Sequence, residues 1–368
     1  MKIAMIYPHI SSEKGISAYT SNLIRNLRSQ GGQIQEIDFI SGNPNSLLKK
    51  FSLLKKCKIL HFQHEYNLFG YFGIPYFFFL GWFKFLANKR IIVTMHTVLS
   101  QKEEFNAGRL KNFLRKFLYQ TQNRWIGLTS KKIVVHADAF KEILIKEYSI
   151  FPNKIVVLPH AIIEDIKTSD KSNSKKELKL NGKVYLLIGS MVPDHGHDII
   201  LRQAGKIDGT ILVATNPSAV NDRNENKILN FLEINRKIVK ENGFQNVRFD
   251  LGEISYEKWW KYFSAADIIL LPYQGGIGSG IFADAMAMKK PVVASDIRYF
   301  REFAKKYGCI KLAKEDRDFP KEISKAMIPK NYKKMEAEAK RYFKENGLTP
   351  ISKKYIKLYK KLKFFNSH

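Results

Sequence analysis

Histidines and a carboxylate stand directly after apolar runs of this 368-residue chain. His64 and Glu65 follow the run at residues 58–62, and His96 follows the run at residues 90–95. An imidazole can orient a hydroxyl group or exchange a proton near neutral pH, and a neighbouring carboxylate can hold it in place. The sequence therefore predicts a polar cluster where these runs end. Capping of a strand or helix by a solvated histidine is the alternative interpretation.

A second candidate site lies at residues 270–296, which read LLPYQGGIGSGIFADAMAMKKPVVASD. An apolar run, a glycine-rich loop, apolar residues at helical spacing and a second apolar run predict strand, loop, helix and strand. Backbone without side chains lets a ligand approach, and the first N–H groups of a helix stabilise a phosphate. Gly278, Ser279 and Gly280 are the expected backbone donors. Close helix packing alone would also explain these glycines.

The elements that must position these residues form a regular pattern. Strand-like runs occur at residues 2–7, 34–40, 58–62, 90–95, 132–135, 155–158, 184–188, 210–214, 247–251, 268–271 and 291–294. Helical patterns between most of them predict an α/β fold with parallel sheets covered on both faces. Ligands of such sheets bind beyond the carboxyl ends of the strands. The polar, serine-rich residues 167–176 are the expected linker between two halves.

Length and composition limit the class of protein. A chain of 368 residues with 45% hydrophobic residues is expected to form two domains with cores of their own. Cys57 and Cys309 stand far apart, which predicts buried thiols of a reducing compartment. No signal-peptide pattern opens the chain, and the apolar residues 71–87 contain Pro75 and Lys84 and fall short of the about 20 that span a membrane. We expect a cytoplasmic protein, soluble or peripheral on the inner face of the cell membrane.

The net charge of +28 produces a strong positive field that attracts anionic partners. Residues 71–85 are dense in aromatic side chains, and the predicted helix at 109–124 carries Lys111, Arg115 and Lys116 opposite an apolar stripe. This combination favours docking on an anionic lipid surface, with a buried ridge and a solvated basic face as the alternative. Nucleic acid is not an expected partner, because no recognition helix or aromatic platform accompanies the charge. No Cys or His cluster has zinc spacing, so no metal and no cofactor is expected.

The phrase Pro-Tyr, glycine loop with Ser-Gly, Asp-Ala-Met-Ala, two lysines and Pro-Val-Val-Ala-Ser-Asp resembles the nucleotide-sugar site of the retaining GT-B glycosyltransferases of family four, the glycosyl transferases group 1. The strongest part of the resemblance is residues 279–296. It implies two facing Rossmann-like doubly wound domains with a cleft between them. Residues 1–165 would be the acceptor-side domain, residues 166–346 the donor domain, and residues 347–368 a basic helix that packs back on the first domain.

The same resemblance implies roles for single residues. His96 and Asp284 would be catalytic. The expected donor-binding residues are Gly189, Ser190, His195, Gly252, Glu253, Gly278, Ser279 and Gly280. The expected acceptor-side residues are Gly15, Ile16, His64, Glu65 and His160.

Three departures mark a divergent member of the family. Gly276 stands where the family has a first Glu, and Ser190 and His195 replace the Arg and Lys that hold the donor diphosphate. The expected reaction moves a mannose- or glucose-type sugar from a nucleotide sugar to a hydroxyl of a lipid-linked or cell-envelope acceptor, with retention and without metal. The alternative is a non-catalytic nucleotide- or glycan-binding relative.

Overall fold

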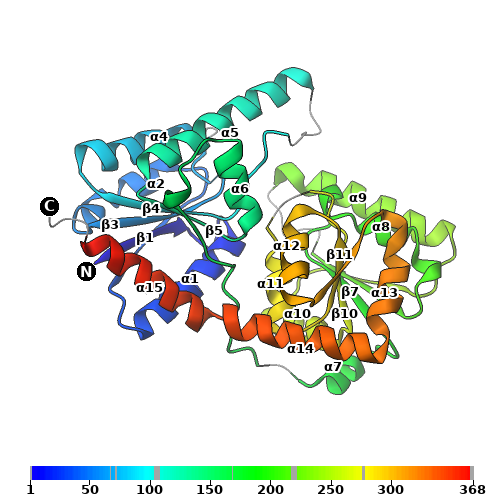
Figure 1. Cartoon of the computed structure of the whole chain (residues 1–368). Coiled ribbons are helices and arrows are strands. Elements are labelled where there is room, and N and C mark those ends of the chain that lie inside the picture. Colours follow the sequence, from blue (N-terminus) through cyan, green and yellow to red (C-terminus); the bar gives the residue numbers. More distant parts are fainter. Residues whose placement is uncertain are drawn as a thin grey trace. The chain divides into compact units, whose positions relative to one another are not determined.

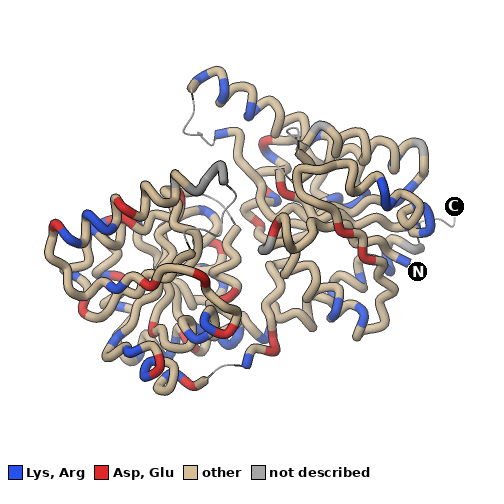
Figure 2. The backbone as a smooth tube through the Cα atoms, turned by 180° about the vertical axis from the view of Figure 1, so that it is seen from behind, with Lys and Arg blue, Asp and Glu red and all other residues tan. Residues whose placement is uncertain are grey.

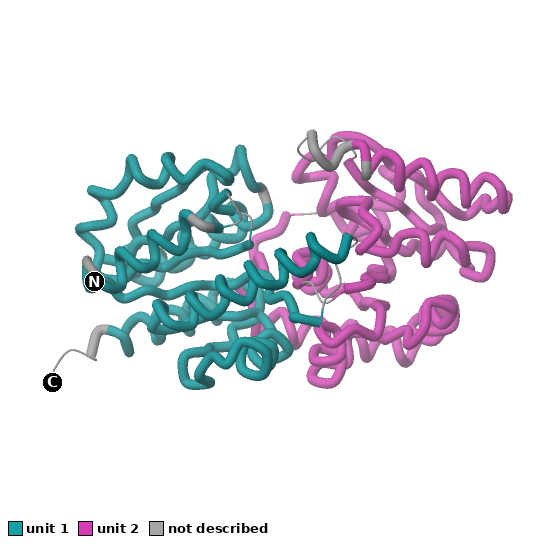
Figure 3. The backbone as a smooth tube through the Cα atoms, turned by 90° about the horizontal axis from the view of Figure 1, so that it is seen from above, with its two compact units in different colours: residues 1–161, 348–368 teal, residues 162–347 magenta. Residues whose placement is uncertain are grey.

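The computed structural model describes residues 2–66, 68–70, 73–102, 108–167, 169–216, 222–275 and 278–364. The chain divides into two compact units (Figure 3). Unit 1 consists of Met1–Ala161 and Leu348–His368, and unit 2 of Ile162–Gly347. Each unit contains one parallel six-stranded sheet, which confirms the predicted α/β class with two Rossmann-like domains.

The sheet of unit 1 has the strand order β2-β1-β3-β4-β5-β6. Its strands are β1 (Ile3–Pro8), β2 (Ile34–Phe39), β3 (Ile59–His64), β4 (Arg90–Met95), β5 (Lys132–Val135) and β6 (Ile155–Val157). Every pair is parallel, and β1 and β3 are almost completely buried, as sheets with helices on both faces require. The strand order reverses between β1 and β3, so the loops after these two strands diverge at a switch point.

Helices cover both faces of this sheet (Figure 1). They are α1 (Lys14–Ser29), α2 (Pro44–Leu48), α3 (Phe51–Lys55), α4 (Ile74–Gly81), the π-helical turn η2 (Trp82–Leu86), α5 (Arg109–Thr129), α6 (Asp138–Lys146), η3 (Pro152–Lys154) and α15 (Leu348–Phe364). One core joins α1 and α15 to Ile3 and Met5 of β1. On the opposite face, Phe62 of β3 packs against Tyr76 of α4 and Phe83 of η2, with ring centroids 5.6 and 6.5 Å apart.

The C-terminal helix α15 is fastened to unit 1 by buried polar contacts. His61 on β3 contacts the Tyr359 hydroxyl through Nδ1 and the Thr94 hydroxyl through Nε2, both at 2.7 Å. Arg90 donates to the carbonyl oxygen of Leu362. Apolar side chains of α15 such as Tyr355 fill the same core as α1, so the basic tail is an integral part of unit 1.

Unit 2 also has a parallel six-stranded sheet, with the different strand order β12-β11-β10-β7-β8-β9. Its strands are β7 (Val184–Ile188), β8 (Thr210–Thr215), β9 (Val247–Leu251), β10 (Ile268–Leu271), β11 (Val292–Ser295) and β12 (Ile310–Ala313). Its helices are α7 (Lys171–Glu177), η4 (Pro193–His195), α8 (His197–Leu201), η5 (Ala204–Lys206), α9 (Asp222–Glu241), α10 (Tyr256–Ala265), α11 (Gly280–Ala287), α12 (Arg298–Tyr307), η6 (Asp316–Asp318), α13 (Phe319–Met327) and α14 (Pro329–Asn346). The switch point lies between β7 and β10.

Two details of unit 2 differ from the expectation. Strand β12 was not predicted, and the predicted linker at residues 167–176 is wrong over its second half, because α7 begins at Lys171. The Asp170 carboxylate caps α7 by accepting from the Asn173 N–H at 2.9 Å, and Lys175 pairs with the buried Asp267 at 2.9 Å. These contacts stabilise a helix where composition alone suggested irregular chain.

Both cysteines, Cys57 and Cys309, are buried free thiols. Within the described ranges, no helix combines the length and the apolar character that crossing a membrane requires. The same residues contain no group of three or more His, Cys, Asp or Glu side chains arranged to hold a metal ion.

Candidate active site

The loops after β7 and β10 meet at the switch point of unit 2. The Gln274 N–H donates to the Asp194 carbonyl at 2.9 Å. Gly196 has φ +63°, and a Cβ added there would stand 2.0 Å from the Pro272 carbonyl oxygen. Only glycine permits this approach, so the backbone of one loop packs directly on the backbone of the other.

His195 lies on this contact, with its ring stacked on Tyr273 at a centroid distance of 4.8 Å. Its Nδ1 is 2.7 Å from the Ser190 carbonyl oxygen, and because a carbonyl only accepts, Nδ1 carries the proton and Nε2 keeps the lone pair. Burial lowers the pKa of His195 below its usual value. The imidazole is therefore neutral near pH 7 and does not supply the charge of the family's lysine, while the Ser190 side chain is exposed and uncharged.

Ser279 is the N-cap of helix α11, which follows the glycine loop as the sequence pattern predicted. Its Oγ accepts from the Phe282 N–H at 3.0 Å and donates to the Tyr273 hydroxyl at 3.2 Å. The backbone of Ser279 is hydrogen-bonded to Tyr299, and the residue is only 5% exposed. Ser279 therefore does not offer a free backbone donor, which corrects the expectation.

The two glycines beside Ser279 remain the accessible part of this loop. Gly280 is exposed and Gly278 is half-buried. Gly276, where the family has its first Glu, lies outside the described residues. The expected set of three backbone donors is thus reduced to Gly278 and Gly280.

Asp284 lies one turn into α11 and accepts from the indole Nε1 of Trp259 on α10 at 3.1 Å. Burial raises the pKa of this carboxyl to about 7, although the Trp259 hydrogen bond opposes the shift. Both protonation states of Asp284 are therefore populated near neutral pH. The protonated form could donate a hydrogen bond to a hydroxyl group, and the carboxylate could accept one. Trp259 was missed from the sequence, since nothing in its local pattern points to α11.

The remaining residues predicted to bind the donor lie beyond the carboxyl ends of β7 and β9, which flank β8. The Gly189 N–H donates to Ala214 of β8 at 3.1 Å, and the Gly252 N–H donates to Thr215 at 3.2 Å. Both glycines have positive φ, 111° and 116° respectively, and Glu253 is exposed. Unit 2 thus brings Gly189, Gly252 and Glu253 to one edge of its sheet.

In unit 1, the candidate histidines form a cluster at the same kind of edge. His96 follows β4, His136 follows β5 and His160 follows β6. The ring centroids of His96 and His136 are 5.1 Å apart, and those of His136 and His160 are 5.3 Å apart. Tyr19 of α1 closes the cluster, 5.2 Å from His96 and 4.3 Å from His160. His136 was not predicted, although it follows its strand as His96 does.

His96 is held in one orientation by Gln63. The distance from its Nε2 to the Gln63 Oε1 is 2.9 Å, and since the amide oxygen only accepts, Nε2 carries the proton. Burial, with the neighbouring imidazoles of His136 and His160 as smaller contributions, holds the pKa of His96 well below its usual value. A neutral His96 with a lone pair on Nδ1 can accept a hydrogen bond from a hydroxyl, but it is a weak base.

His64 and Glu65 have different surroundings although they are adjacent. His64 is fully buried, stacks on Tyr76 at 5.1 Å, and has its pKa lowered by burial to about 3. It cannot touch an acceptor in this structure, which corrects the expected role. Glu65 is half-buried, and burial raises the pKa of its carboxyl. It accepts from the Tyr66 N–H at 3.0 Å.

The loop before α1 also differs from the expectation. The Glu13 carboxylate accepts from the Gly15 N–H at 3.0 Å and from the Ile16 N–H at 2.6 Å. The chain's own carboxylate therefore occupies the N-terminus of α1. An acceptor would reach the Gly15 and Ile16 backbone only after Glu13 moved.

Known proteins resemble this chain at two levels. Residues 182–329 match the family model described as Glycosyl transferases group 1. No curated protein sequence matches the chain. A glycosyltransferase from Rickettsia africae is 15% identical, with a TM-score of 0.71 over 99% of each chain. Sucrose-phosphate synthase from Thermosynechococcus elongatus is 13% identical, with a TM-score of 0.78 over 98% of this chain and 99% of that one.

HepE from Anabaena, solved in complex with UDP, is 11% identical, with a TM-score of 0.72 over 98% of this chain and 100% of that one. At such identities the structures establish the fold, whereas the family model matches residues 182–329 by their sequence. The chain has the GT-B fold, and its residues 182–329 match the glycosyl transferases group 1, which confirms the resemblance found in the sequence.

Proposed function

We propose that the chain transfers a mannose- or glucose-type sugar from a nucleotide sugar to a hydroxyl acceptor, with retention of configuration and without a metal ion. The observation that carries this proposal is the Trp259–Asp284 contact on α11, inside residues that match the group 1 family. Asp284 stands beside the two loops at the switch point of unit 2, the place where sheets of this type bind ligands. In this reaction the protein must stabilise the departing diphosphate and hold the acceptor.

Unit 2 would bind the donor. Asp284 would hydrogen-bond ribose or sugar hydroxyls, and the backbone of Gly278 and Gly280 would face the diphosphate. Gly252 and Glu253 would lie near the nucleotide base. His195 would contribute a neutral imidazole, which a bound diphosphate could recharge, since a nearby anion raises the pKa of a histidine. HepE was crystallised with UDP-glucose, so UDP-sugars are the first donors to test.

Unit 1 would bind the acceptor, which we take to be lipid-linked or part of a cell-envelope glycan. His96 would offer the lone pair of Nδ1 to a hydroxyl, and its low pKa favours orientation of the sugar or acceptor over proton transfer. His160 and Glu65 would line the same side. His136 would position His96 through their ring contact at 5.1 Å.

Substitution of Asp284 and His96 tests the assignment. Asp284→Ala and His96→Ala should each abolish sugar transfer while leaving the circular dichroism spectrum unchanged, because both remove a polar group without filling space in a core. The measurement is transfer from a panel of UDP- and GDP-sugars, preceded by a thermal-shift screen for the donor that stabilises the chain, with and without EDTA. Asp316→Asn, at an exposed carboxylate of unit 2, is the matched control. Full activity in both alanine variants would contradict the assignment.

A non-catalytic relative that binds a nucleotide or a glycan is the second candidate. Ser190 and the neutral His195 favour it, because the fixed cations that hold a diphosphate in the family are replaced. A nucleotide sugar that raises the melting temperature of the wild-type chain but is neither transferred nor hydrolysed would select this candidate.

A further inference from the structure

One side of unit 1 exposes large apolar side chains that no described part of the chain covers. We call it the aromatic-basic face, and its apolar members, exposed by between 50% and 75%, are Phe78, Trp82, Phe85, Leu110, Phe113, Leu114, Phe117, Leu128 and Phe151. Among the described residues, every Phe or Trp counted as exposed belongs to this set. Such a concentration marks an interaction surface, whereas scattered single residues would not.

The helix α4 and the turn η2 are apolar on both sides. Phe79 and Phe83 face the core and are only 6% and 1% exposed, whereas Phe78, Trp82 and Phe85 share the outward side. The core is thus complete without the outward rings. A helical segment that is apolar around its circumference needs a second apolar environment.

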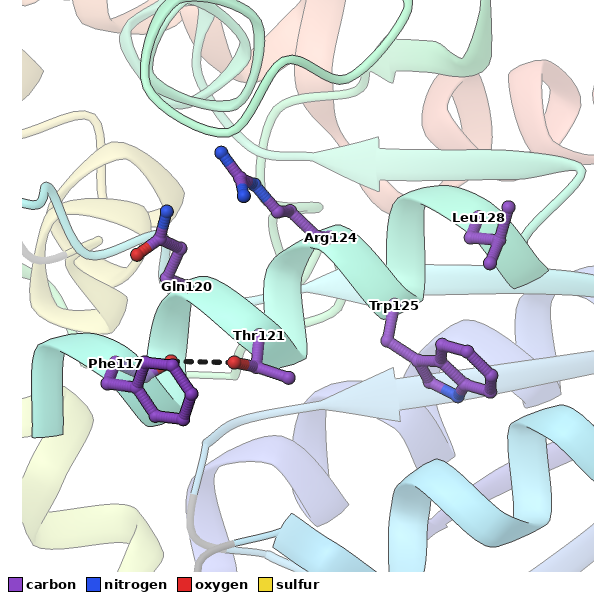
Figure 4. Close-up of a pocket in the computed structure, with 6 residues that line it drawn as sticks. All are labelled: Phe117, Gln120, Thr121, Arg124, Trp125 and Leu128. Carbon is purple, nitrogen blue, oxygen red and sulfur yellow. Dashed lines mark hydrogen bonds between the residues drawn. The ribbon is translucent and has the colours of Figure 1, made fainter. Parts of the chain in front are cut away.

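Helix α5 extends this surface. Residues 109–111, 113–115 and 117 are exposed, so most of the circumference of the first turns of α5 faces solvent. Further along, Phe117, Thr121, Trp125 and Leu128 line a shallow hollow (Figure 4). Trp125 donates from Nε1 to the Phe77 carbonyl at 3.0 Å, and its ring lies 6.2 Å from that of Phe85. The exposed rings of α4, η2 and α5 therefore form one continuous surface.

The part of the sequence that carries most of these rings is strongly basic. Residues 66–137 contain 11 Lys and Arg but only two carboxylates, Glu103 and Glu104, which lie outside the described residues. Helix α5 itself has five Lys and Arg and no Asp or Glu, and blue bands run along it in Figure 2. Near the end of α5, burial lowers the pKa of Lys154, and the neighbouring charges of Lys84 and Lys131 lower it further. An anionic partner would reduce the electrostatic repulsion among these cations.

We propose that the aromatic-basic face docks unit 1 on the surface of an anionic lipid bilayer. Aromatic rings settle at the depth of the headgroups, and Lys and Arg at the rim reach lipid phosphates. A lipid surface can take up exposed apolar side chains over a wide area, and charge complementarity with the Lys and Arg residues requires it to be negative. The docking does not depend on the proposed transferase function, because it can be measured without a donor.

Co-sedimentation of the full chain with vesicles tests the proposal. The chain should bind vesicles of phosphatidylcholine with phosphatidylglycerol, bind pure phosphatidylcholine at least tenfold more weakly, and dissociate as salt is raised. Phe113→Ser with Phe117→Ser should lower the partition coefficient at least tenfold. The matched control, Leu229→Ser with Ile234→Ser on α9, removes two exposed apolar side chains from unit 2 and should leave it unchanged.

Charge substitutions separate the electrostatic part. Lys111→Gln with Lys116→Gln should lower binding to anionic vesicles about tenfold and leave the weak binding to neutral vesicles unchanged. Lys237→Gln with Lys240→Gln on α9 is the control of equal charge. Brominated lipid should quench tryptophan emission in the wild-type chain. It should quench the emission less in Trp82→Phe, because this variant lacks the exposed indole of the aromatic-basic face.

The proposal would be overturned by equal recovery with neutral and anionic vesicles, or by unchanged binding of the Phe113/Phe117 double variant. A dimer detected by light scattering, lost in the same double variant and accompanied by no vesicle binding, would also overturn it. That result would assign the face to a second copy of the chain.

Discussion

The two units each contain a parallel six-stranded sheet, but the strand orders differ and the candidate sites are built from different kinds of residue. In unit 2 the edge of the sheet is made by backbone and small side chains: Gly196 packs against the Pro272 carbonyl, and Ser279 caps α11. In unit 1 the corresponding edge is made by rings, with His96, His136 and Tyr19 in mutual contact. The family model matches residues 182–329 and not unit 1.

This difference explains why the glycine loop of unit 2 can be recognised in the sequence. A loop that depends on close backbone approach tolerates only glycine at the approach, so its pattern stays visible. A cluster of rings requires only that aromatic or imidazole side chains meet, and many spacings allow that. Glu13 adds to the contrast, because unit 1 fills the N-terminus of α1 with its own carboxylate.

The largest expected effect breaks the backbone contact in unit 2. Gly196→Ala should destabilise the chain by roughly 2–3 kcal/mol more than Gly243→Ala, because the new Cβ meets the Pro272 oxygen as well as the strain of a positive φ. Gly243 has nearly the same φ, +64°, with nothing within 4 Å of the added Cβ, so it isolates the clash. Urea denaturation measures both variants.

A glycine of unit 1, Gly15, serves as the comparison for the Gly196 and Gly243 variants. Gly15→Ala should be almost neutral, since the nearest atom to the added Cβ is Glu13 Oε1 at 3.3 Å and the end of that side chain can shift. If Gly196→Ala proved as stable as Gly243→Ala, the close contact between Gly196 and the Pro272 carbonyl would not be needed to form this edge of unit 2.

An intermediate effect is expected on acidification, with unit 1 loosening first. Burial depresses the pKa of His61 and His64 to about 3 and of His136 to about 4, below the usual value near 6.5. Stability from neutral buried imidazoles is complete above pH 6.5 and is lost as pH falls towards 4, at about 1.4 kcal/mol per pKa unit for each group. Hydrogen exchange read by mass spectrometry at pH 4.5 and 7.5 follows each unit separately.

Unit 2 has a compensating group. The pKa of Asp284 is raised to about 7, so unit 2 gains stability as pH falls from 7 towards 4, which opposes the loss from His197 with its pKa of about 3. Asp284→Asn should remove this gain and make the two units more alike in acid. Earlier loosening of unit 2 in the wild-type chain would reverse the comparison.

The smallest expected effect concerns the cap of α11. Ser279→Ala should cost about 1 kcal/mol of stability, as should Ser255→Ala, which removes the cap of α10 on the Lys258 N–H at 3.2 Å. Only Ser279→Ala also frees the Tyr273 hydroxyl, so it alone should weaken donor binding, by about tenfold in a calorimetric titration. Equal donor affinity in the two variants would mean that the cap serves the helix and not the site.

The strands could be predicted closely because buried parallel strands are continuous apolar runs, and the run 268–271 coincides with β10. The surroundings of individual side chains were harder to predict. His64 and His96 obey the same strand-end rule, yet His64 is the last residue of β3 and is buried against Tyr76, while His96 lies beyond the end of β4 and reaches the cluster. Successive residues of a strand point to opposite faces, so one position decides between core and site.

The sequence by itself determined two α/β halves, the glycine loop before α11, and the family that this loop resembles. The tertiary structure alone decided that Trp259 holds Asp284 and that His136 joins His96. Strand and loop patterns follow from local hydrophobicity and backbone freedom, which a short stretch of chain carries. Partners 25 or more residues apart, as Trp259 and Asp284 are, meet only when helices pack on a sheet, and no local pattern records that meeting.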